Sequence, residues 1–153
     1  MPPILGSTDT DTTAAEFVQS GPRTIDHGNG ITQTFDEHGN ETWYRNGLLH
    51  RDDDLPAIIQ ANGTQHWYCN GLRHRDNDLP ALLFVDGTQC WFKDGKQHRD
   101  GDKPAYIGRD GGQAWWVDGN LHRDGDKPAI IYSDGGQDWY VNGDFLRRLT
   151  QKL

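Results

Sequence analysis

A strict 24-residue period is the feature that most constrains this chain. Five tryptophans follow one another at that step without insertion or deletion: Trp43, Trp67, Trp91, Trp115 and Trp139. Three further columns keep the step, and their members are His50, His74, His98 and His122, then Arg51, Arg75, Arg99 and Arg123, then Pro56, Pro80, Pro104 and Pro128. A fixed period on the order of 20–50 residues is the signature of a repeat architecture. The sequence therefore predicts about four and a half copies of one unit.

Each copy carries two dipeptides that favour tight turns. In the second copy they are Asn70-Gly71 and Asp86-Gly87. Asn, Asp and Gly accept the positive φ angles that a type I′ hairpin turn requires, so we expect strands on either side of both dipeptides.

Two strands are expected around the second turn. Residues 88–93 read as one six-residue strand, with Trp91 on one face and Phe92 on the other. Before it, residues 81–85 read as a second strand, preceded at residues 76–80 by a corner or bulge because proline cannot donate to a ladder. Each copy is expected to add one hairpin to a growing antiparallel sheet.

The composition favours the same fold class. The chain has 19 glycines and 10% aromatic residues, a pairing of turn formers with strand formers. Hydrophobic residues make up only 33%, but the period arranges them in columns, including the ladder Ile59, Leu83, Ile107 and Ile131. We expect an all-β, elongated antiparallel β-hairpin repeat, built as a solenoid or a twisted ribbon.

The domain organisation follows from where the period begins and ends. Residues 1–28 lack it and are expected to form a flexible leader, while residues 29–153 form a single β-repeat domain. We place a partial N-terminal cap at 29–42, copies beginning at residues 43, 67, 91 and 115, and a C-terminal cap at 139–153.

Charge limits the classes of partner. A net charge of -8 and a pI near 5.2 argue against direct nucleic-acid binding and against an acidic membrane surface. No stretch approaches the roughly 18 apolar residues of a membrane span, and we expect a cytoplasmic protein of a bacterial or infected host cell. Cys69 and Cys90 are expected to be free thiols, since they match no disulfide framework or metal spacing.

The His-Arg-Asp triplet is the motif that most resembles chemistry, because protein kinases carry it in their catalytic loop. The other kinase motifs are missing, and four equivalent copies do not form one constellation of unlike groups. A hydrolase using His98 and Asp100 lacks a nucleophile beside the histidine. We predict no enzyme and no cofactor, with Arg pairing to Asp of its own or the adjacent copy, the first Asp bonding turn amides and His capping a strand end.

Two further interpretations concern metal ions and the aromatic columns. Asp100, Asp102 and their counterparts resemble oxygen-rich calcium loops, but the EF-hand pattern needs more acidic positions, so no metal site is predicted. The Trp column is expected to form core. A narrow sheet can cover only one face well, so either the Trp column or a second aromatic column is expected to lie exposed, the second being Tyr44, Tyr68, Phe92, Trp116 and Tyr140. The candidate binding anchors are Tyr44, Tyr68, Phe92 and Trp116.

The alternation of W-Y-x-N-G with a His-containing return strand resembles the MORN class of β-hairpin repeats. It is still more similar to the W-Y-x-N-G-x-x-H-R-x-x-x-x-P-A repeat proteins of phages, giant viruses and some bacteria. The similarity covers residues 34–143 and departs from the MORN pattern where Arg follows His and where Pro-Ala replaces the second Gly. The resemblance implies an extended sheet with protein-binding or scaffolding roles and no catalytic residues, and the departures argue against lipid binding.

We therefore expect a protein-binding module, such as a phage or mobile-element inhibitor of a bacterial defence or nucleic-acid-handling enzyme, acting as a monomer or homodimer. Its aspartates would mimic a phosphate backbone in a basic channel. The binding candidates are Asp52, Asp53, Asp54 and Leu55 at the first corner and Asp76, Asp78 and Leu79 at the second, with Lys103 and Lys127 marking where the surface changes. The alternatives are a structural scaffold or toxin-immunity protein and a calcium-binding repeat protein.

Overall fold

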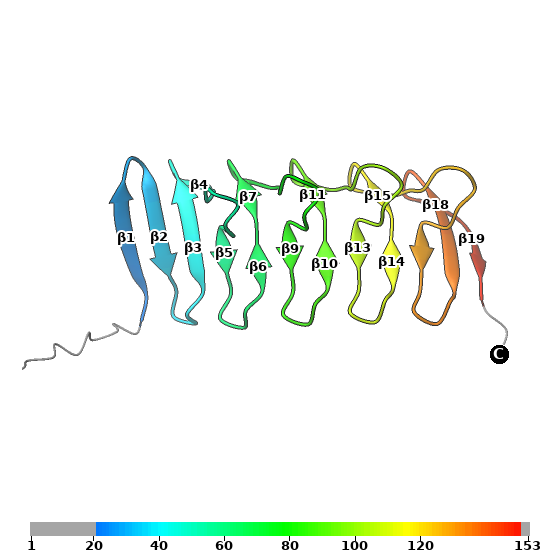
Figure 1. Ribbon diagram of the computed structural model, residues 1–153, viewed down its shortest axis with the longest axis horizontal. Helices are drawn as coiled ribbons and strands as arrows, with labels where there is room; N and C mark the ends of the chain where they lie inside the picture. The colour runs from blue at the N-terminus through cyan, green and yellow to red at the C-terminus, as the bar shows by residue number, and fades with distance from the viewer. Residues whose placement is uncertain (1–20, 151–153) are drawn as a thin grey trace, which may run out of the picture.

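The computed structural model describes residues 21–150, which form nineteen β-strands and no helix. The all-β prediction is confirmed. The strands lie side by side along the long axis of the molecule (Figure 1). Their bounds are β1 Arg23–Gly28, β2 Ile31–Phe35, β3 Glu41–Arg45, β4 Leu48–Leu49, β5 Ile58–Ile59, β6 Gln65–His66, β7 Tyr68–Cys69, β8 Leu72–Arg73, β9 Leu82–Leu83, β10 Gln89–Cys90, β11 Phe92–Lys93, β12 Lys96–Gln97, β13 Tyr106–Ile107, β14 Gln113–Ala114, β15 Trp116–Val117, β16 Asn120–Leu121, β17 Ile130–Ile131, β18 Gln137–Val141 and β19 Asp144–Leu149.

One large antiparallel sheet runs the length of the molecule. Its order is β1-β2-β3-β5-β6-β9-β10-β13-β14-β17-β18-β19, with β4 paired to β3 off this path. Three separate two-stranded hairpins accompany it, namely β7–β8, β11–β12 and β15–β16. The chain thus alternates between the main sheet and a row of small hairpins beside it (Figure 1).

The predicted six-residue strand at 88–93 is wrong, because the chain bends at Trp91. Residues before the bend lie in β10 of the main sheet, and residues after it lie in β11 of a small hairpin. The Trp91 N–H donates to the carbonyl of Ala105 at 2.8 Å, while its own carbonyl accepts from the N–H of His98 at 3.1 Å. The N–H and the carbonyl of Trp91 thus both have hydrogen-bond partners, in two different segments of the chain, so the bend at Trp91 leaves no backbone group unpaired.

The two turn dipeptides adopt different conformations. Asn70 and Gly71 have φ angles of 48° and 84°, as the predicted type I′ turn requires. At the other dipeptide only Gly87 has a positive φ, 90°, and its N–H donates to the carbonyl of Phe84 at 2.9 Å. The second turn is therefore a type I turn followed by a left-handed glycine, because the Asp86 carboxylate accepts the N–H of Thr88 and holds Asp86 outside the left-handed region.

The predicted corners are four loops at residues 50–56, 74–80, 98–104 and 122–128, called here the corner loops. Each places two successive residues in the left-handed region, for example Asn77 at φ 60° and Asp78 at φ 56°. The N–H of Leu79 then donates to the carbonyl of Asp76 at 3.2 Å. Asn, Asp and Gly are the residues that reach this region at least cost, which explains the Asp-rich composition of the loops.

The buried core consists mainly of alanines and tryptophans. The alanine after each corner-loop proline is fully buried, at 0% exposure, in all four copies: Ala57, Ala81, Ala105 and Ala129. Three tryptophans, Trp67, Trp91 and Trp115, are 5–6% exposed, whereas Trp43 and Trp139 near the ends are half-buried. The backbone joins the two sets, since the N–H of each of the three buried tryptophans donates to the carbonyl of the alanine 14 residues later.

Each end of the sheet is a six-residue strand. Arg23–Gly28 forms β1 and pairs with β2, so the expected leader boundary at residue 28 is wrong for this segment. The turn at Asn29 and Gly30, with φ angles of 52° and 75°, connects the pair. The rest of the predicted leader, residues 1–20, lies outside the described residues. At the other end β18 and β19 occupy most of the predicted cap.

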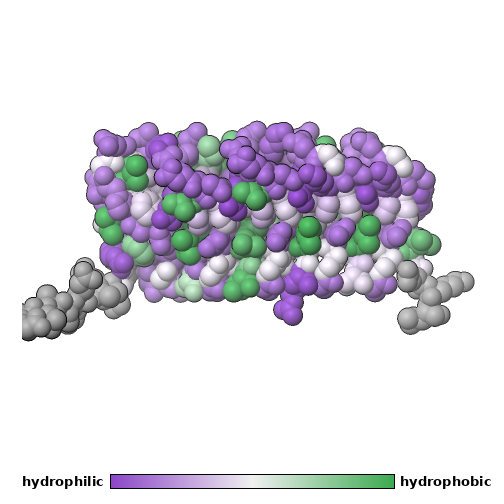
Figure 2. Space-filling model, viewed as in Figure 1, coloured by the Kyte–Doolittle hydropathy of each residue, from purple (hydrophilic) through white to green (hydrophobic). Residues whose placement is uncertain are grey.

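Polar and apolar residues occupy different parts of the face drawn in Figure 2. Figure 2 shows hydrophilic residues crowded along the upper edge, where the corner loops lie, and apolar residues spaced along the lower half. Within residues 21–150 no helix is long and apolar enough to cross a membrane.

Candidate binding site along the corner loops

The arginines of the last three corner loops are bound to the loop of the preceding copy, whereas Arg51 of the first loop lies 3.5 Å from Glu41 of β3. Arg99 Nε donates to Asp78 Oδ1 at 2.7 Å and Arg99 Nη2 donates to Asp78 Oδ2 at 3.0 Å. Arg75 binds Asp54 and Arg123 binds Asp102 in the same two-bond manner, and Arg147 binds Asp126 through one bond. The expected pairing of Arg with Asp is found, and it runs between adjacent copies.

The same arginine covers the tryptophan beneath it. Arg99 Cζ lies 3.8 Å from the ring centroid of Trp91, and Arg99 Nη1 donates to the carbonyl of Pro104 at 3.2 Å. All five tryptophans of the column carry an arginine at 3.7–4.4 Å. The Trp91 Nε1–H donates to the carbonyl of Asp78 at 2.9 Å, so indole and guanidinium are both anchored to the preceding loop.

Lysines reinforce two of these ion pairs. Lys103 Nζ lies 2.8 Å from Asp78 Oδ2, and Lys127 Nζ lies 2.6 Å from Asp102 Oδ2. Hydrogen bonds from Arg123 and then Lys127 lower the pKa of Asp102 to about 2, and Arg99 with Lys103 holds the pKa of Asp78 lower still. These carboxylates therefore stay ionised and are already neutralised by the protein itself.

Each histidine joins three parts of the molecule. His98 Nδ1 accepts the backbone N–H of Asp118, in the turn of the next hairpin, at 3.1 Å. His98 Nε2 lies 2.9 Å from Asp100 Oδ1, so the neutral ring carries its proton on Nε2 and donates it to that carboxylate. The expected bond from the first Asp to turn amides is thus wrong, since the histidine bonds the turn amide and the aspartate bonds the histidine.

The predicted acidic binding residues divide into engaged and available groups. Asp54 and Asp78 are held by arginines, and Asp52 is bound by Arg45 and His50. Asp53 is exposed, and the side chain of Asp76 is 84% exposed. Leu55 and Leu79 are 44% and 38% exposed. Three of the five predicted aspartates therefore form ion pairs with arginines of the protein itself.

The second aromatic column is more open than the tryptophan column. Tyr44, Tyr68, Phe92 and Trp116 are all half-buried, and they begin or lie in the strands beside the corner loops. Arg73 lies 5.2 Å from the ring centroid of Tyr68 and 4.9 Å from that of Phe92. Tyr140 instead packs edge-on against Phe145, at 5.4 Å between centroids.

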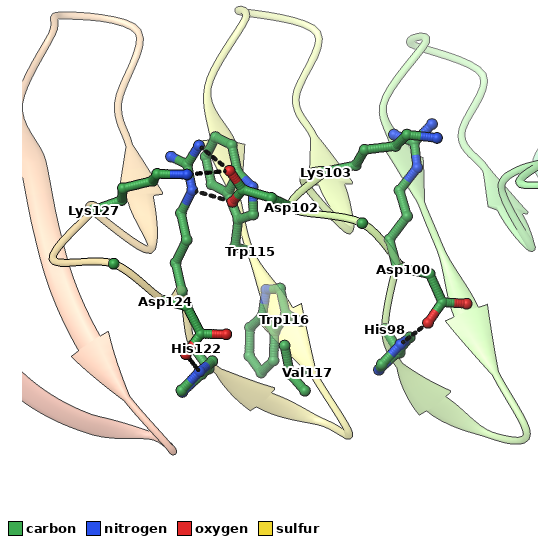
Figure 3. A pocket seen from close by; sticks show the side chains of 14 residues that line it. His98, Asp100, Asp102, Lys103, Trp115, Trp116, Val117, His122, Asp124 and Lys127 are labelled. Carbon is green, nitrogen blue, oxygen red and sulfur yellow. Dashed lines mark hydrogen bonds and ion pairs between the residues drawn. The ribbon is translucent and has the colours of Figure 1, made fainter.

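Three grooves lie along the corner loops, two of them between successive loops, and together they are called here the inter-loop grooves. The groove between the last two loops has a volume of ≈ 290 Å³ and the one before it ≈ 310 Å³. A third, of ≈ 210 Å³, lies over Trp43 and Tyr44 beside the first loop. In the first of these, Trp116 and Val117 lie between His98 and His122, with Trp115 deeper beneath the Asp102 ion pair (Figure 3).

The rims of the grooves carry both charges. The side chains of Asp100 and Asp124 are 75% and 97% exposed, and those of Lys103 and Lys127 are 53% and 50% exposed. The predicted acidic binding candidates end at the second corner, although Asp100 and Asp124 occupy the same position after His-Arg as Asp76. The structure shows that all three are exposed in the same way.

The described residues offer no ready metal centre. Across residues 21–150 there is no group of three or more His, Cys, Asp or Glu side chains placed to hold an ion. The calcium alternative therefore finds no donor cluster on these loops. In each loop the aspartate directly before the leucine–proline or lysine–proline pair is already bound by an arginine: Asp54, Asp78, Asp102 and Asp126.

Comparison with protein-family models gave no match to this chain, and comparison with curated proteins gave none either.

Proposed function

We propose that this chain is a non-enzymatic, MORN-like hairpin-repeat module with a 24-residue unit, and that it binds a protein partner along its corner-loop edge. The observation that carries the proposal is the row of inter-loop grooves, in which equivalent aromatic floors recur beside exposed charged rims. A repeated surface of this kind suits an extended contact with one macromolecule better than a single small ligand.

The groove floors supply the anchoring contacts. Phe92 and Trp116 are half-buried, so they are held in place by the fold and still present ring surface. Rigid aromatic side chains cost little conformational entropy on binding and dominate interface hot spots. The internal ion pairs around Asp78 and Asp102 hold the walls of the grooves in position without competing for the partner.

The rim carboxylates and the net charge of -8 favour a basic partner. Asp76, Asp100 and Asp124 are each 75% or more exposed and bond to histidine through their Oδ1 atoms, and Asp100 also binds the exposed Lys93 through Oδ2 at 3.0 Å. Such a row would steer a basic surface and speed its association. A nucleic-acid-handling enzyme of a bacterial host is the partner class that this charge fits, and the protein would act on it as a stoichiometric inhibitor.

A charge-matched pair of variants tests the proposal. One variant carries Asp76→Asn, Asp100→Asn and Asp124→Asn on the corner-loop edge. The control carries Asp86→Asn, Asp110→Asn and Asp134→Asn in the turns of the main sheet, where Asn62 already occupies the equivalent position. Both remove three charges, and both should remain folded because the exchanged side chains are exposed.

Affinity capture from a bacterial lysate should recover a basic protein with the wild type and the control and lose it with the corner-loop variant. Binding should weaken as ionic strength rises. Equal capture by all three proteins, capture of no basic protein, or binding that salt does not change would each contradict the proposal.

A further inference from the structure

The two ends of the main sheet are open strands of equal length. Arg23–Gly28 and Asp144–Leu149 have six residues each, and within residues 21–150 each pairs with a neighbour on one side alone. A strand at a sheet edge presents unpaired N–H and C=O groups that can accept another strand. The structure therefore has two equivalent places where its hydrogen-bonded ladder could continue.

The direction of the strands fits these two ends to each other. Twelve strands form the path from β1 to β19, and all eleven neighbouring pairs along it are antiparallel. An odd number of reversals makes β1 and β19 run in opposite directions, as Figure 1 also shows. A second copy placed in line with the first would thus bring its β1 antiparallel to β19, without a change of orientation.

β19 carries exposed apolar side chains beside its charged ones, and its pairing with β18 has one register shift, between Trp139 and Tyr140. Phe145, Leu146 and Leu149 are 53%, 55% and 55% exposed. Its two cations are already engaged, since Arg147 binds Asp126 and Arg148 binds Asp138, both at 2.6 Å. Natural edges are commonly guarded by free lysines or prolines, whereas here half of the strand is exposed apolar surface.

The charges favour contact between unlike ends. Two β19 strands placed together would bring Arg147 and Arg148 of both copies close to one another, and like charges across a strand pair are unfavourable. β1 instead carries one arginine, Arg23, together with the exposed Asp26 and with Ile25, which is 37% exposed. The charges of β19 therefore complement those of β1 from another copy better than those of β19 from another copy.

We propose that this chain associates head to tail with further copies of itself, with β19 of one copy adding to β1 of the next. The main sheet then continues through the junction, and each copy extends the assembly by about 58 Å, at roughly 4.8 Å per strand over twelve strands. A heterologous contact of this kind leaves one β1 and one β19 free at the ends, so the assembly is open-ended. It uses the ends of the molecule and does not depend on the proposed corner-loop function.

Analytical ultracentrifugation of the full chain across a concentration series tests the junction. The wild type should form a series of multiples of 17.3 kDa that lengthens with concentration. Two variants block one end each, Ile25→Lys on β1 and Leu146→Lys with Leu149→Lys on β19. A control carries Leu48→Lys and Leu72→Lys, at positions with matching exposure of 51% and 50% beside the main sheet.

Each end-blocked variant alone should stay at 17.3 kDa, and a 1:1 mixture of the two should form a dimer that grows no further, because each supplies the intact end that the other lacks. The control should assemble like the wild type, and thermal melting should show all variants folded. A wild type that stays monomeric, or an Ile25→Lys variant that dimerises with itself, would overturn the proposal.

Discussion

Arg99 and Asp78 form a two-bond ion pair across the boundary between two corner loops, 21 residues apart in the chain, while the same guanidinium lies over the ring of Trp91. One side chain therefore joins the loop of one copy to the tryptophan of the next. The stability of the molecule along its axis should depend on this residue and its equivalents.

Replacing Arg99 with Lys should destabilise the protein by about 1–2 kcal/mol, because lysine keeps the charge but cannot make the planar two-bond contact or stack on the indole. Arg99 is 15% exposed, which leaves little room for water to substitute. Urea denaturation measures the change. The matched control is Arg147→Lys, where the arginine is 50% exposed and makes one bond, and its loss should be clearly smaller.

Replacing Asp78 with Asn should cost about 1 kcal/mol at low salt, since the ion pair is lost although the left-handed loop conformation is retained. Asp78 is 41% exposed, so the difference from wild type should shrink in 1 M salt. The Asp53→Asn variant is the control, because Asn77 already occupies the equivalent position in the next loop. An equal loss in both variants would assign the effect to the loop and not to the ion pair.

Stability should fall as pH is lowered through the range of histidine titration. Burial and then the nearby Arg45 lower the pKa of His50 below its ordinary value of 6.5, while Asp52 bonds the other ring nitrogen. The unfolded chain binds the proton more tightly, so the contribution of His50 is complete above pH 6.5 and is lost as pH falls through the lower pKa of the folded state.

The structural reason is that His50 Nδ1 accepts the backbone N–H of Asn70 at 3.1 Å, and a protonated ring would place two donors face to face. Urea denaturation between pH 7.5 and 5 should show the loss, and a His50→Gln variant should show a flatter dependence over that range. An unchanged slope in the variant would remove His50 as the cause. The lowered pKa of Asp54 and Asp102 affects a separate window below pH 4.

The buried alanines should not tolerate enlargement. Ala105 is fully buried, at 0% exposure, and its carbonyl accepts the Trp91 N–H, so Ala105→Val should destabilise the protein by about 1–3 kcal/mol through overpacking. Thermal or urea denaturation measures this. The exposed Ala61 in a turn of the main sheet is the control, and Ala61→Val should stay within about 0.5 kcal/mol of the wild type.

The two cysteines should differ in reactivity. Both are free thiols, as the sequence predicted, but Cys69 is exposed whereas Cys90 is buried and burial raises the pKa of its thiol to about 11. A maleimide should label Cys69 within minutes and label Cys90 only when the protein is unfolded. Mass spectrometry of the labelled peptides distinguishes the two, and Cys69→Ser provides the control for the slow site.

Much of the fold could be predicted because the local signals are strong. The Asn70-Gly71 turn, the all-β class and the break at the corner-loop proline could be predicted because the residues at these positions favour few other conformations. The bend at Trp91 could not be predicted from the alternation of residues, because it depends on the partners that the Trp91 N–H and carbonyl find in two other strands. The alternation of residues along a strand indicates which face of the sheet each side chain occupies. It does not indicate where the backbone changes from one hydrogen-bonded neighbour strand to another.

The candidate site was predicted less completely. The Asp-rich loops were identified, but the sequence could not tell which carboxylates face inward. Asp78 and Asp76 are two residues apart, yet one is neutralised by Arg99 and Lys103 while the other faces solvent. Whether an aspartate is paired depends on the distance to the arginine of the next loop. That distance is determined by how the strands of the main sheet stack, and the sequence of one loop does not contain it.

The orientation of the main sheet also determines how the molecule would respond to tension. Its interstrand hydrogen bonds lie along the long axis, because antiparallel bonds run perpendicular to the strands and the strands cross that axis (Figure 1). Pulling on the two ends would load these bonds one pair at a time, as a zipper opens. Separation of 24 residues, the period of the sequence, would release about 80 Å of extended chain, so the protein should yield in steps at low force.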